Sequence, residues 1–514
     1  GDIMLQDQFG YTLDTSNEAA ASAYRNYIDC VLTYGTEWHA GEEAHSKDPG
    51  SWFARIAEAD GTICSYDIPA AASLIAAMTR DSQGVSDIDP RAQLYMKAMD
   101  AWICQGDPDK AAQTYQEVLR HYPKDLFALK RSQLLYFAAG SVPEMLSVCQ
   151  LDQVASSHES SPYYHAMLSF GLEQNGQADA AHEAAKRGVV LKQDDAWAHH
   201  GLAHADYNAG RLAEGARTLL SYAHYWDDRP LCSFLYTHNW WHVALFHLDM
   251  NRYGDAWRLY KERVWEGRGK CDPTNIQDQM GALGLLVKLY IRLVFIEHYR
   301  QEWLGGGARS VSEPSVEDIK AAMKVVLGRA SATNLQSHYE PLFDVLSVAA
   351  FTITGNDETA TKMISEVESI AKGMPAKRKT AGDAWLGAMR GSRAWAQQDF
   401  IATVSELAAV LDDLKYLFAS YEQCDVIREM FLHAGVLALA EGASPPSPDM
   451  AKVSSLIDSR MNEPRAAHVP CYAILKALYL HAAKGDGDGA TAKAELVRQA
   501  GQVETKYASE QIDV

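Results

Sequence analysis

Apolar residues recur at the three- and four-residue spacing of an amphipathic helix along most of this 514-residue chain. Strict alternation of apolar and polar residues, which would indicate strands, is rare. The helical stretches stop at regularly placed glycines or asparagines, which commonly end helices. The pattern therefore predicts an all-α fold.

The helical stretches also repeat as pairs. One unit starts at Gly106-Asp107-Pro108 and continues with a small residue, Ala111, an aromatic, Tyr115, an aliphatic, Val118, and a closing Pro123. This order is that of a tetratricopeptide unit, in which each residue type fills a set place between two antiparallel helices. Similar turns follow, several of them about 34 residues apart, at Gly140, Asn175-Gly176, Gly210, Asn251, Gly355-Asn356, Gln398-Asp399 and Gly485 to Gly489. The chain is thus predicted to be a solenoid of helix pairs with a concave groove.

Segments rich in glycine, serine or proline interrupt the repeats, because they cannot continue a helix. They are Leu304 to Pro314, Gly373 to Thr380 and Gly442 to Asp449. We take the first as the boundary between two halves. The expected organisation is an N-terminal helical segment over 1–90, tetratricopeptide repeats carrying the groove over 91–303, and C-terminal helical repeats over 315–514.

The repeat register separates core positions from groove positions in the helix that ends before Gly210. Counting Gly210 as position 15 makes Ala196 position 1, and helical periodicity then assigns each side chain to a face. The predicted core positions are His199, Leu202, Ala203 and Asp206. The predicted groove positions are Trp197, His200, His204 and Tyr207. The same rule places Tyr163, Ala166, Phe170 and Glu173 of the preceding repeat in the groove, and His165 inside.

A second aromatic and histidine-rich stretch, Tyr236 to Leu245, is predicted to form the next groove helix. Its register turns His238 and Trp241 to the groove and His247 inward, leaves His242 at the edge, and makes Trp240 a packing residue. Histidines four residues apart share one helical face. Two such helices packed side by side would gather imidazoles and indoles in one place.

Charge and cysteine usage restrict the partners and the compartment. A formal net charge of −20 argues against nucleic acid, since binding phosphates needs basic stripes. The eight cysteines lie far apart without a Cys-x-x-Cys pair, which favours a cytoplasmic protein over a disulfide-bonded one. The sequence contains neither a membrane-spanning apolar run nor a secretory signal pattern, so we expect no membrane partner.

The usual motifs for zinc hydrolysis, nucleotide binding, serine hydrolysis and dinucleotide binding are absent, which lowers the expectation of an enzyme without excluding it. The pairs His200/His204 and His238/His242 could in principle hold Zn²⁺ or Cu²⁺. Without a carboxylate to complete a catalytic site, we expect no metal and no cofactor. A histidine among aromatics can also act as general acid or base. His204 and His238 are the catalytic candidates.

Several stretches resemble the tetratricopeptide repeat protein 38 family, most closely over residues 10 to 260. They are Leu13 to Ser16 with Tyr34-Gly35, His121 to Asp125 with Ala128-Leu129-Lys130, Ala196-Trp197-Ala198 with His204, and Tyr236 to His247. The chain departs from the family at Asp48 to Phe53, and at Asp425 to Phe431, where relatives tend to carry a histidine. The resemblance implies an α-solenoid that curls tightly, and it implies no settled activity.

The sequence favours a binding protein that holds a small ligand, with an aromatic one preferred, or a protein partner. Trp197, His200, Tyr207, Trp241 and His242 are the expected ligand-binding residues. Lysine, arginine and asparagine, which clamp acidic peptides, are few among them. The competing hypothesis is a small-molecule hydrolase or lyase that uses the groove histidines. Apolar solenoid ends favour a homodimer.

Overall fold

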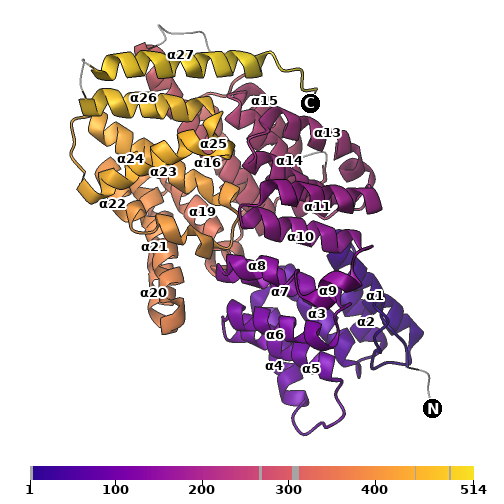
Figure 1. The fold of residues 1–514 in the computed structure, drawn as a ribbon. Coiled ribbons are helices and arrows are strands. Elements are labelled where there is room, and N and C mark those ends of the chain that lie inside the picture. The colour runs from indigo at the N-terminus through magenta and orange to yellow at the C-terminus, as the bar shows by residue number, and fades with distance from the viewer. Residues whose placement is uncertain (1–3, 266–268, 304–311, 446, 485–487, 514) are drawn as a thin grey trace. The chain divides into compact units, whose positions relative to one another are not determined.

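We describe the protein from a computed structural model, drawn in Figure 1. The structure describes residues 4–265, 269–303, 312–445, 447–484 and 488–513, and of residues 296–303, 484 and 488–489 only the backbone. Over these ranges every named element is a helix, and the extended segments contribute a single isolated bridge between Gln6 and Thr12. The all-α prediction is confirmed.

The chain forms a succession of mostly short α-helices. The helices up to residue 249 are α1 (Glu18–Thr33), α2 (Ala40–Lys47), α3 (Trp52–Cys64), α4 (Ile68–Asp81), α5 (Pro90–Met99), α6 (Pro108–His121), α7 (Leu126–Ala139), α8 (Val142–Ser147), α9 (Asp152–Ser157), α10 (Pro162–Gln174), α11 (Ala178–Leu191), α12 (Ala196–Asn208), α13 (Leu212–Asp228) and α14 (Ser233–Asp249). The later helices are α15 (Tyr253–Leu259), α16 (Ile276–Trp303), α17 (Val316–Arg329), α18 (Ala332–Ser337), α19 (Pro341–Ile353), α20 (Asp357–Gly373), α21 (Lys379–Ala396), α22 (Phe400–Ala408), α23 (Tyr421–Ala440), α24 (Ser447–Asn462), α25 (Pro464–Ala467), α26 (Pro470–Lys484) and α27 (Asp488–Ala508).

The helices form tandem pairs joined by tight turns, as the repeat pattern predicts. Gly106, Gly140, Gly176 and Gly210 all adopt the left-handed conformation, with φ of 62°, 73°, 77° and 75°. A residue without a Cβ takes up this conformation at no steric cost, so glycine ends one helix and lets the next return against it. Asn251 and Gly355 occupy equivalent left-handed turns. The expected turn at Gly485 to Gly489 includes residues 485–487, which lie outside the described residues.

Local sequence explains where many of these helices begin. The Asp107 carboxylate caps α6 by accepting from the Lys110 amide, and Ser161 caps α10 through the Tyr164 amide. Proline follows each cap at the first helical position, where its missing N–H costs nothing. Helix starts at caps of this kind can be predicted from sequence alone.

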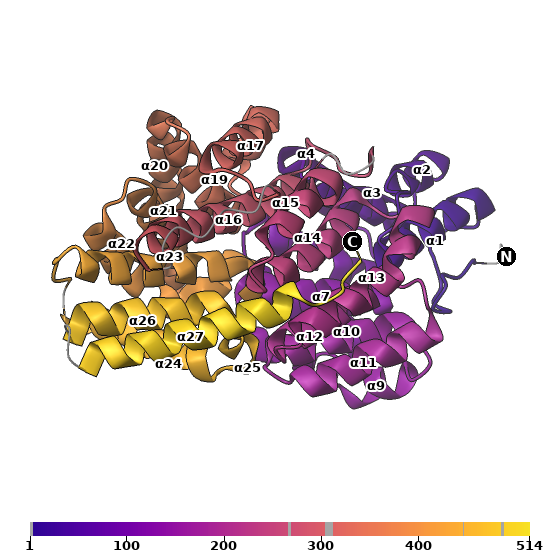
Figure 2. The same ribbon diagram turned by 90° about the horizontal axis from the view of Figure 1, so that it is seen from above.

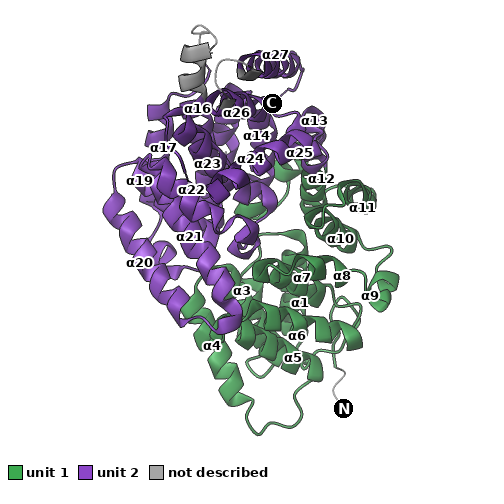
Figure 3. Cartoon of the chain, turned by 60° about the vertical axis from the view of Figure 1, so that its left-hand side comes forward, with its two compact units in different colours: residues 1–205, 222–235 green, residues 206–221, 236–514 purple. Residues whose placement is uncertain are grey.

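The chain divides into two compact units (Figure 3). Unit 1 comprises residues 1–205 and 222–235, and unit 2 comprises residues 206–221 and 236–514. The division therefore falls inside α12, α13 and α14. The three domain ranges expected from the sequence remain predictions, and residues 304–311 of the expected boundary segment lie outside the described residues.

The core of unit 1 contains a buried ion pair among aromatic and aliphatic side chains. Arg131 on α7 donates two hydrogen bonds to the Asp60 carboxylate on α3, at 2.9 and 2.6 Å. The Tyr27 hydroxyl on α1 donates to the same carboxylate. Both members of the pair are almost fully buried, so each stabilises the other's charge and the contact fixes these three helices in one register.

Unit 2 contains a larger buried ionic network. The Arg292 guanidinium on α16 donates to Glu429 on α23, at 2.7 and 2.6 Å, and to Asp249 on α14, at 2.8 Å. One helix turn away, Arg460 on α24 pairs with Asp425 on α23. These side chains are at most 2% exposed, so the network replaces solvation for all of them and ties four helices together. Figures 1 and 2 both show α26 and α27 running side by side at the C-terminal end of this unit.

No helix within the described ranges combines the length and the apolar character that crossing a bilayer requires.

Candidate metal centre

Helices α12 and α14 carry the histidines and tryptophans that the sequence analysis selects. The Asp195 carboxylate precedes α12 and accepts from the Trp197 and Ala198 amides, which fixes where this helix starts. Its first turns then present Trp197, His200 and His204 on one face, because residues three and four apart are neighbours on a helix. On α14 the same rule aligns His238, Trp241 and His242.

The two imidazoles of α12 point their Nε2 atoms at each other. The His200 and His204 Nε2 atoms are 2.9 Å apart, and the rings meet edge to face at 4.4 Å between centroids. Trp197 stacks on His200 at 4.3 Å with an interplanar angle of 17°. The indole therefore holds the imidazole plane in place and shields one side of it from water.

The imidazoles of α14 have a related arrangement. His238 stacks on Trp241 at 5.4 Å, with ring planes within 5° of parallel. His242 meets His238 edge to face at 4.7 Å. Each helix thus supplies one imidazole stacked on an indole and a second imidazole roughly perpendicular to the first.

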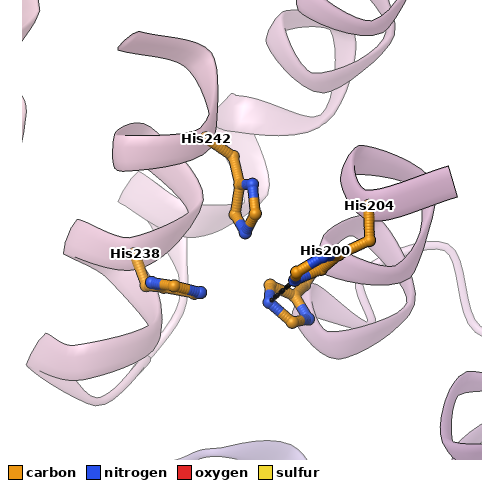
Figure 4. Close-up of side chains that lie close together, drawn as sticks. All are labelled: His200, His204, His238 and His242. Carbon is orange, nitrogen blue, oxygen red and sulfur yellow. Dashed lines mark hydrogen bonds between the residues drawn. The ribbon is translucent and has the colours of Figure 1, made fainter. Parts of the chain in front are cut away.

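One ring nitrogen from each of His200, His204, His238 and His242 lies within 4.8 Å of the other three (Figure 4). Figure 4 shows His200 and His204 on one helix and His238 and His242 on the other. Four nitrogens around a zinc ion, with Zn–N distances of about 2.0–2.1 Å, would be about 3.4 Å apart.

Residues near the ends of α12 and of α14 make contacts that lie within a single unit. Toward the N-terminal ends, the Tyr34 ring lies 4.9 Å from the Trp197 ring and 6.2 Å from the Phe234 ring, all within unit 1. Toward the C-terminal ends, the Tyr207 hydroxyl donates to the Asp249 carboxylate at 2.6 Å, within unit 2. The turns that bear the histidines lie between these two contacts.

A carboxylate lies against the α12 imidazoles. The Glu173 Oε1 atom, at the end of α10, is 3.5 Å from His204 Nδ1, and both side chains are 1% exposed. A second carboxylate, Glu422 on α23, groups with Glu173 and His204 to within 4.8 Å between ligand atoms. Asn208 Nδ2 donates to Glu422 at 2.9 Å. The sequence register placed Glu173 correctly with the groove residues but gave no reason to add Glu422.

The candidate residues are buried instead of lining an open surface. Their exposed fractions run from 1% for His204 and His242 to 8% for His238, with Trp197, His200, Tyr207 and Trp241 in between. Tyr207 is engaged by Asp249, and burial raises its pKa well above its ordinary value. The arrangement suits a group small enough to be enclosed by side chains.

The residues predicted to pack inward do so. His199 accepts from Trp226 Nε1 at its Nδ1 atom, at 3.1 Å, and stacks on Tyr222 of the partner helix α13. His247 is fully buried, with its Nδ1 atom 3.7 Å from Asp255. Trp240 lies beneath the Arg263 guanidinium at 4.4 Å. His242, assigned to the groove edge, joins the other three imidazoles.

Two residues near this cluster escaped the sequence analysis as functional candidates. Glu422 lies more than 200 residues along the chain from His204, and no local pattern signals that α23 returns to α12. Lys130 on α7 places its amine 4.9 Å from the Trp197 ring. It appeared in the analysis only as part of the Ala128-Leu129-Lys130 stretch.

No family model matches the chain, so the proposed kinship with the tetratricopeptide repeat protein 38 family stays a resemblance. A structure of the human IFIT1 dimer with m7Gppp-AAAA matches 98% of this chain and 98% of its own, at 10% sequence identity and a TM-score of 0.41. The exclusion of nucleic acid as a partner is withdrawn, and the neighbour itself was solved with m7Gppp-AAAA. The exclusion rested on a net charge of −20, and a charge summed over the chain does not describe any one binding surface.

Proposed function

We propose that this helical-repeat protein binds one transition metal ion, Zn²⁺ or Cu²⁺, through His200, His204, His238 and His242. The observation that carries the proposal is the convergence of four buried imidazole nitrogens to within 4.8 Å of one another. Neutral imidazoles are the ligands that these two ions share, and the set contains no thiolate that would favour other metals.

The geometry of α12 and α14 preorganises the imidazole ligands for metal binding. A pair at i and i+4 on a helix needs no backbone rearrangement to chelate. The His200 and His204 Nε2 atoms, which lie 2.9 Å apart, would separate to about 3.4 Å around a zinc ion. Stacking on Trp197 and Trp241 restrains His200 and His238. Restrained ligands lose little side-chain entropy on binding, which increases affinity.

The surroundings also suit a divalent cation electrostatically. Glu173 beside His204 Nδ1 favours the tautomer with the proton on Nδ1, which leaves the Nε2 lone pair for the ion. The Glu173 and Glu422 carboxyl groups, when ionised, would balance the charge of an ion held by four neutral imidazoles.

The aromatic ligand favoured at first is less well supported than a metal. The faces of Trp197 are stacked against His200 and Tyr34, and Trp241 is stacked on His238. These indoles therefore stack on the imidazoles of the site, and these stacked faces cannot also bind a flat aromatic ligand. With four protein ligands the centre is closed, which is typical of a binding or structural role and less so of catalysis.

The test is metal content. The full-length protein is stripped with a chelator, reloaded with equimolar Zn²⁺ or Cu²⁺, desalted and analysed by elemental mass spectrometry. We expect about one ion per chain, and a loss of affinity of at least about 100-fold in His200→Ala and His242→Ala. His224→Ala is the matched control, because His224 is exposed on α13. Failure of the native chain to retain either ion, or equal retention by all variants, would refute the proposal.

One observation keeps an acid–base enzyme as a second candidate. The contact between Glu173 and His204 is also the arrangement in which a carboxylate orients a catalytic base, with His238 as the opposing acid. The two functions give opposite results with a chelator, because hydrolysis or elimination by metal-free histidines would survive it.

A further inference from the structure

Lys130 is a buried amine without a charged partner. It lies on α7 inside unit 1, is 4% exposed, and makes no hydrogen bond or ion pair with any residue that the structure describes. Its Nζ atom contacts the Tyr34 ring at 4.2 Å and the Trp197 ring at 4.9 Å. These two rings are stacked on each other, so the amine lies against an aromatic surface.

The charges around Lys130 favour its neutral form. Burial, together with the adjacent Arg131 cation, lowers the pKa of the amine to about 7 despite a weaker opposing effect of Asp195. The Asp60 carboxylate is already engaged by two hydrogen bonds from Arg131. A buried lysine beside another cation is the environment in which amines become nucleophiles near neutral pH.

We propose that Lys130 is a nucleophilic amine that forms an imine with the carbonyl group of a small aldehyde or ketone. The nitrogen lone pair attacks the carbonyl carbon to form a C–N bond. The carbonyl oxygen takes one proton from the attacking nitrogen and one from solvent and leaves as water as the C–O bond breaks, and a protonated imine remains. That product is again a cation at the Nζ position, and the faces of Tyr34 and Trp197 stabilise it as they stabilise an ammonium ion.

The chain offers a matched control in Lys288 on α16. Lys288 is equally buried, but its Nζ atom lies 3.3 Å from Glu429 and 3.7 Å from Asp425. These carboxylates outweigh burial and raise the pKa of Lys288 above its ordinary value. Burial lowers the pKa of both amines. Lys288 stays protonated because carboxylates lie beside it, and Lys130 has no such carboxylate in contact.

The experiment is reductive trapping on the folded, full-length protein. Benzaldehyde and sodium cyanoborohydride are added at pH 7.5, and the rate of benzylation of each lysine is read by peptide mass spectrometry. Hydride from cyanoborohydride reduces the imine to a stable secondary amine. We expect Lys130 to react more than about tenfold faster than Lys362, whose side chain is 65% exposed, and Lys288 to stay unlabelled.

The outcomes are decisive in both directions. Loss of the label in Lys130→Arg, with unchanged circular dichroism, completes the support. Labelling of Lys130 no faster than Lys362, absence of label on Lys130, or equal labelling of Lys130 and Lys288 overturns the proposal. Urea-unfolded protein, in which all lysines should react alike, checks that each peptide is detected. His238→Ala should retain fast labelling, so failure of the metal centre and failure of this amine are separate results.

Discussion

At the scale of single residues, the contact between Glu173 and His204 has the most specific consequence. A carboxylate beside one ring nitrogen selects which nitrogen of the imidazole keeps its lone pair. Glu173 would then act through His204 and need not touch the ion itself. This role separates it from the four histidines, and affinity measurements can detect the difference.

Glu173→Gln should therefore lower Zn²⁺ affinity by about 10–100-fold while one ion per chain still binds. The amide can no longer balance charge or hold the Nδ1 proton as strongly. Competition with a chromophoric chelator measures the affinity. Glu183→Gln on α11, whose side chain is 72% exposed, is the control. Unchanged affinity would contradict the role, and complete loss of the ion would make Glu173 a ligand instead.

Helical periodicity predicted which face of its helix each of several side chains occupies. Counting back from Gly210 separated His199, which packs on α13, from His200 and His204. It also grouped Phe170 and Glu173 with them, and Phe170 does contact Trp197. Periodicity assigns side chains to the faces of one helix, but it does not identify which helices from distant parts of the sequence pack against those faces. For that reason Glu422 and the enclosure of the whole cluster could not be predicted.

At the scale of helices, a glycine within a helix allows the backbone of a neighbouring helix to approach closely. A Cβ atom added at Gly171 on α10 would lie 2.8 Å from the Met145 carbonyl oxygen and 3.0 Å from the Leu146 Cα atom of α8. Backbone atoms cannot move aside as a flexible side chain can. The absence of a side chain at this position therefore fixes the distance between these two helices.

Gly171→Ala should destabilise unit 1 by about 1–3 kcal/mol, despite the better helix propensity of alanine. Gly328→Ala on α17 is the matched control, because a Cβ atom there meets nothing within 4 Å. The control should gain up to about 1 kcal/mol from propensity alone. Urea unfolding of both variants measures the difference. A Gly171→Ala protein as stable as the control would show that α8 and α10 can separate freely.

The pairing of helices was predictable because its signals are local. Gly106, Gly140, Gly176 and Gly210 ended helices where the repeat pattern placed them, and Asp107 and Ser161 capped those that follow. The domain ranges rested on Gly- and Pro-rich segments, which show where a helix stops. Such segments carry no information about long-range contacts, and the compact units are defined by those contacts.

At the scale of the whole molecule, the free energy of unfolding depends on pH because titratable side chains are buried in the folded state. His433 on α23 is fully buried against Phe295, and desolvation lowers its pKa to about 3. The unfolded chain takes up a proton at this histidine below about pH 6.5, whereas the folded chain does so only near pH 3. The unfolded state thus binds more protons in this window, and the folded state loses stability as pH falls through it.

His433→Gln should remove this contribution. At pH 7.5 the variant is expected to be less stable than the native chain, because a buried ring is replaced. At pH 5 the gap should shrink by about 2 kcal/mol, at 1.36 kcal/mol for each pH unit below 6.5. Urea unfolding at the two pH values tests this, with exposed His224→Gln as the control. A gap that stays constant would mean that His433 already carries its proton when folded.

The loop that follows the first helix limits the order in which this chain can fold. Tyr34 adopts the left-handed conformation there, its carbonyl oxygen accepts from the Cys232 amide at 2.7 Å, and its ring packs on Trp197. During synthesis, the N-terminal helix must therefore wait for some 200 further residues to emerge before its contacts are complete. An array of repeats can usually form one unit at a time, with each supported only by its neighbours. Here the loop that ends the first helix is completed among the last, and a nascent chain halted before residue 232 would lack the hydrogen bond from Cys232 to Tyr34.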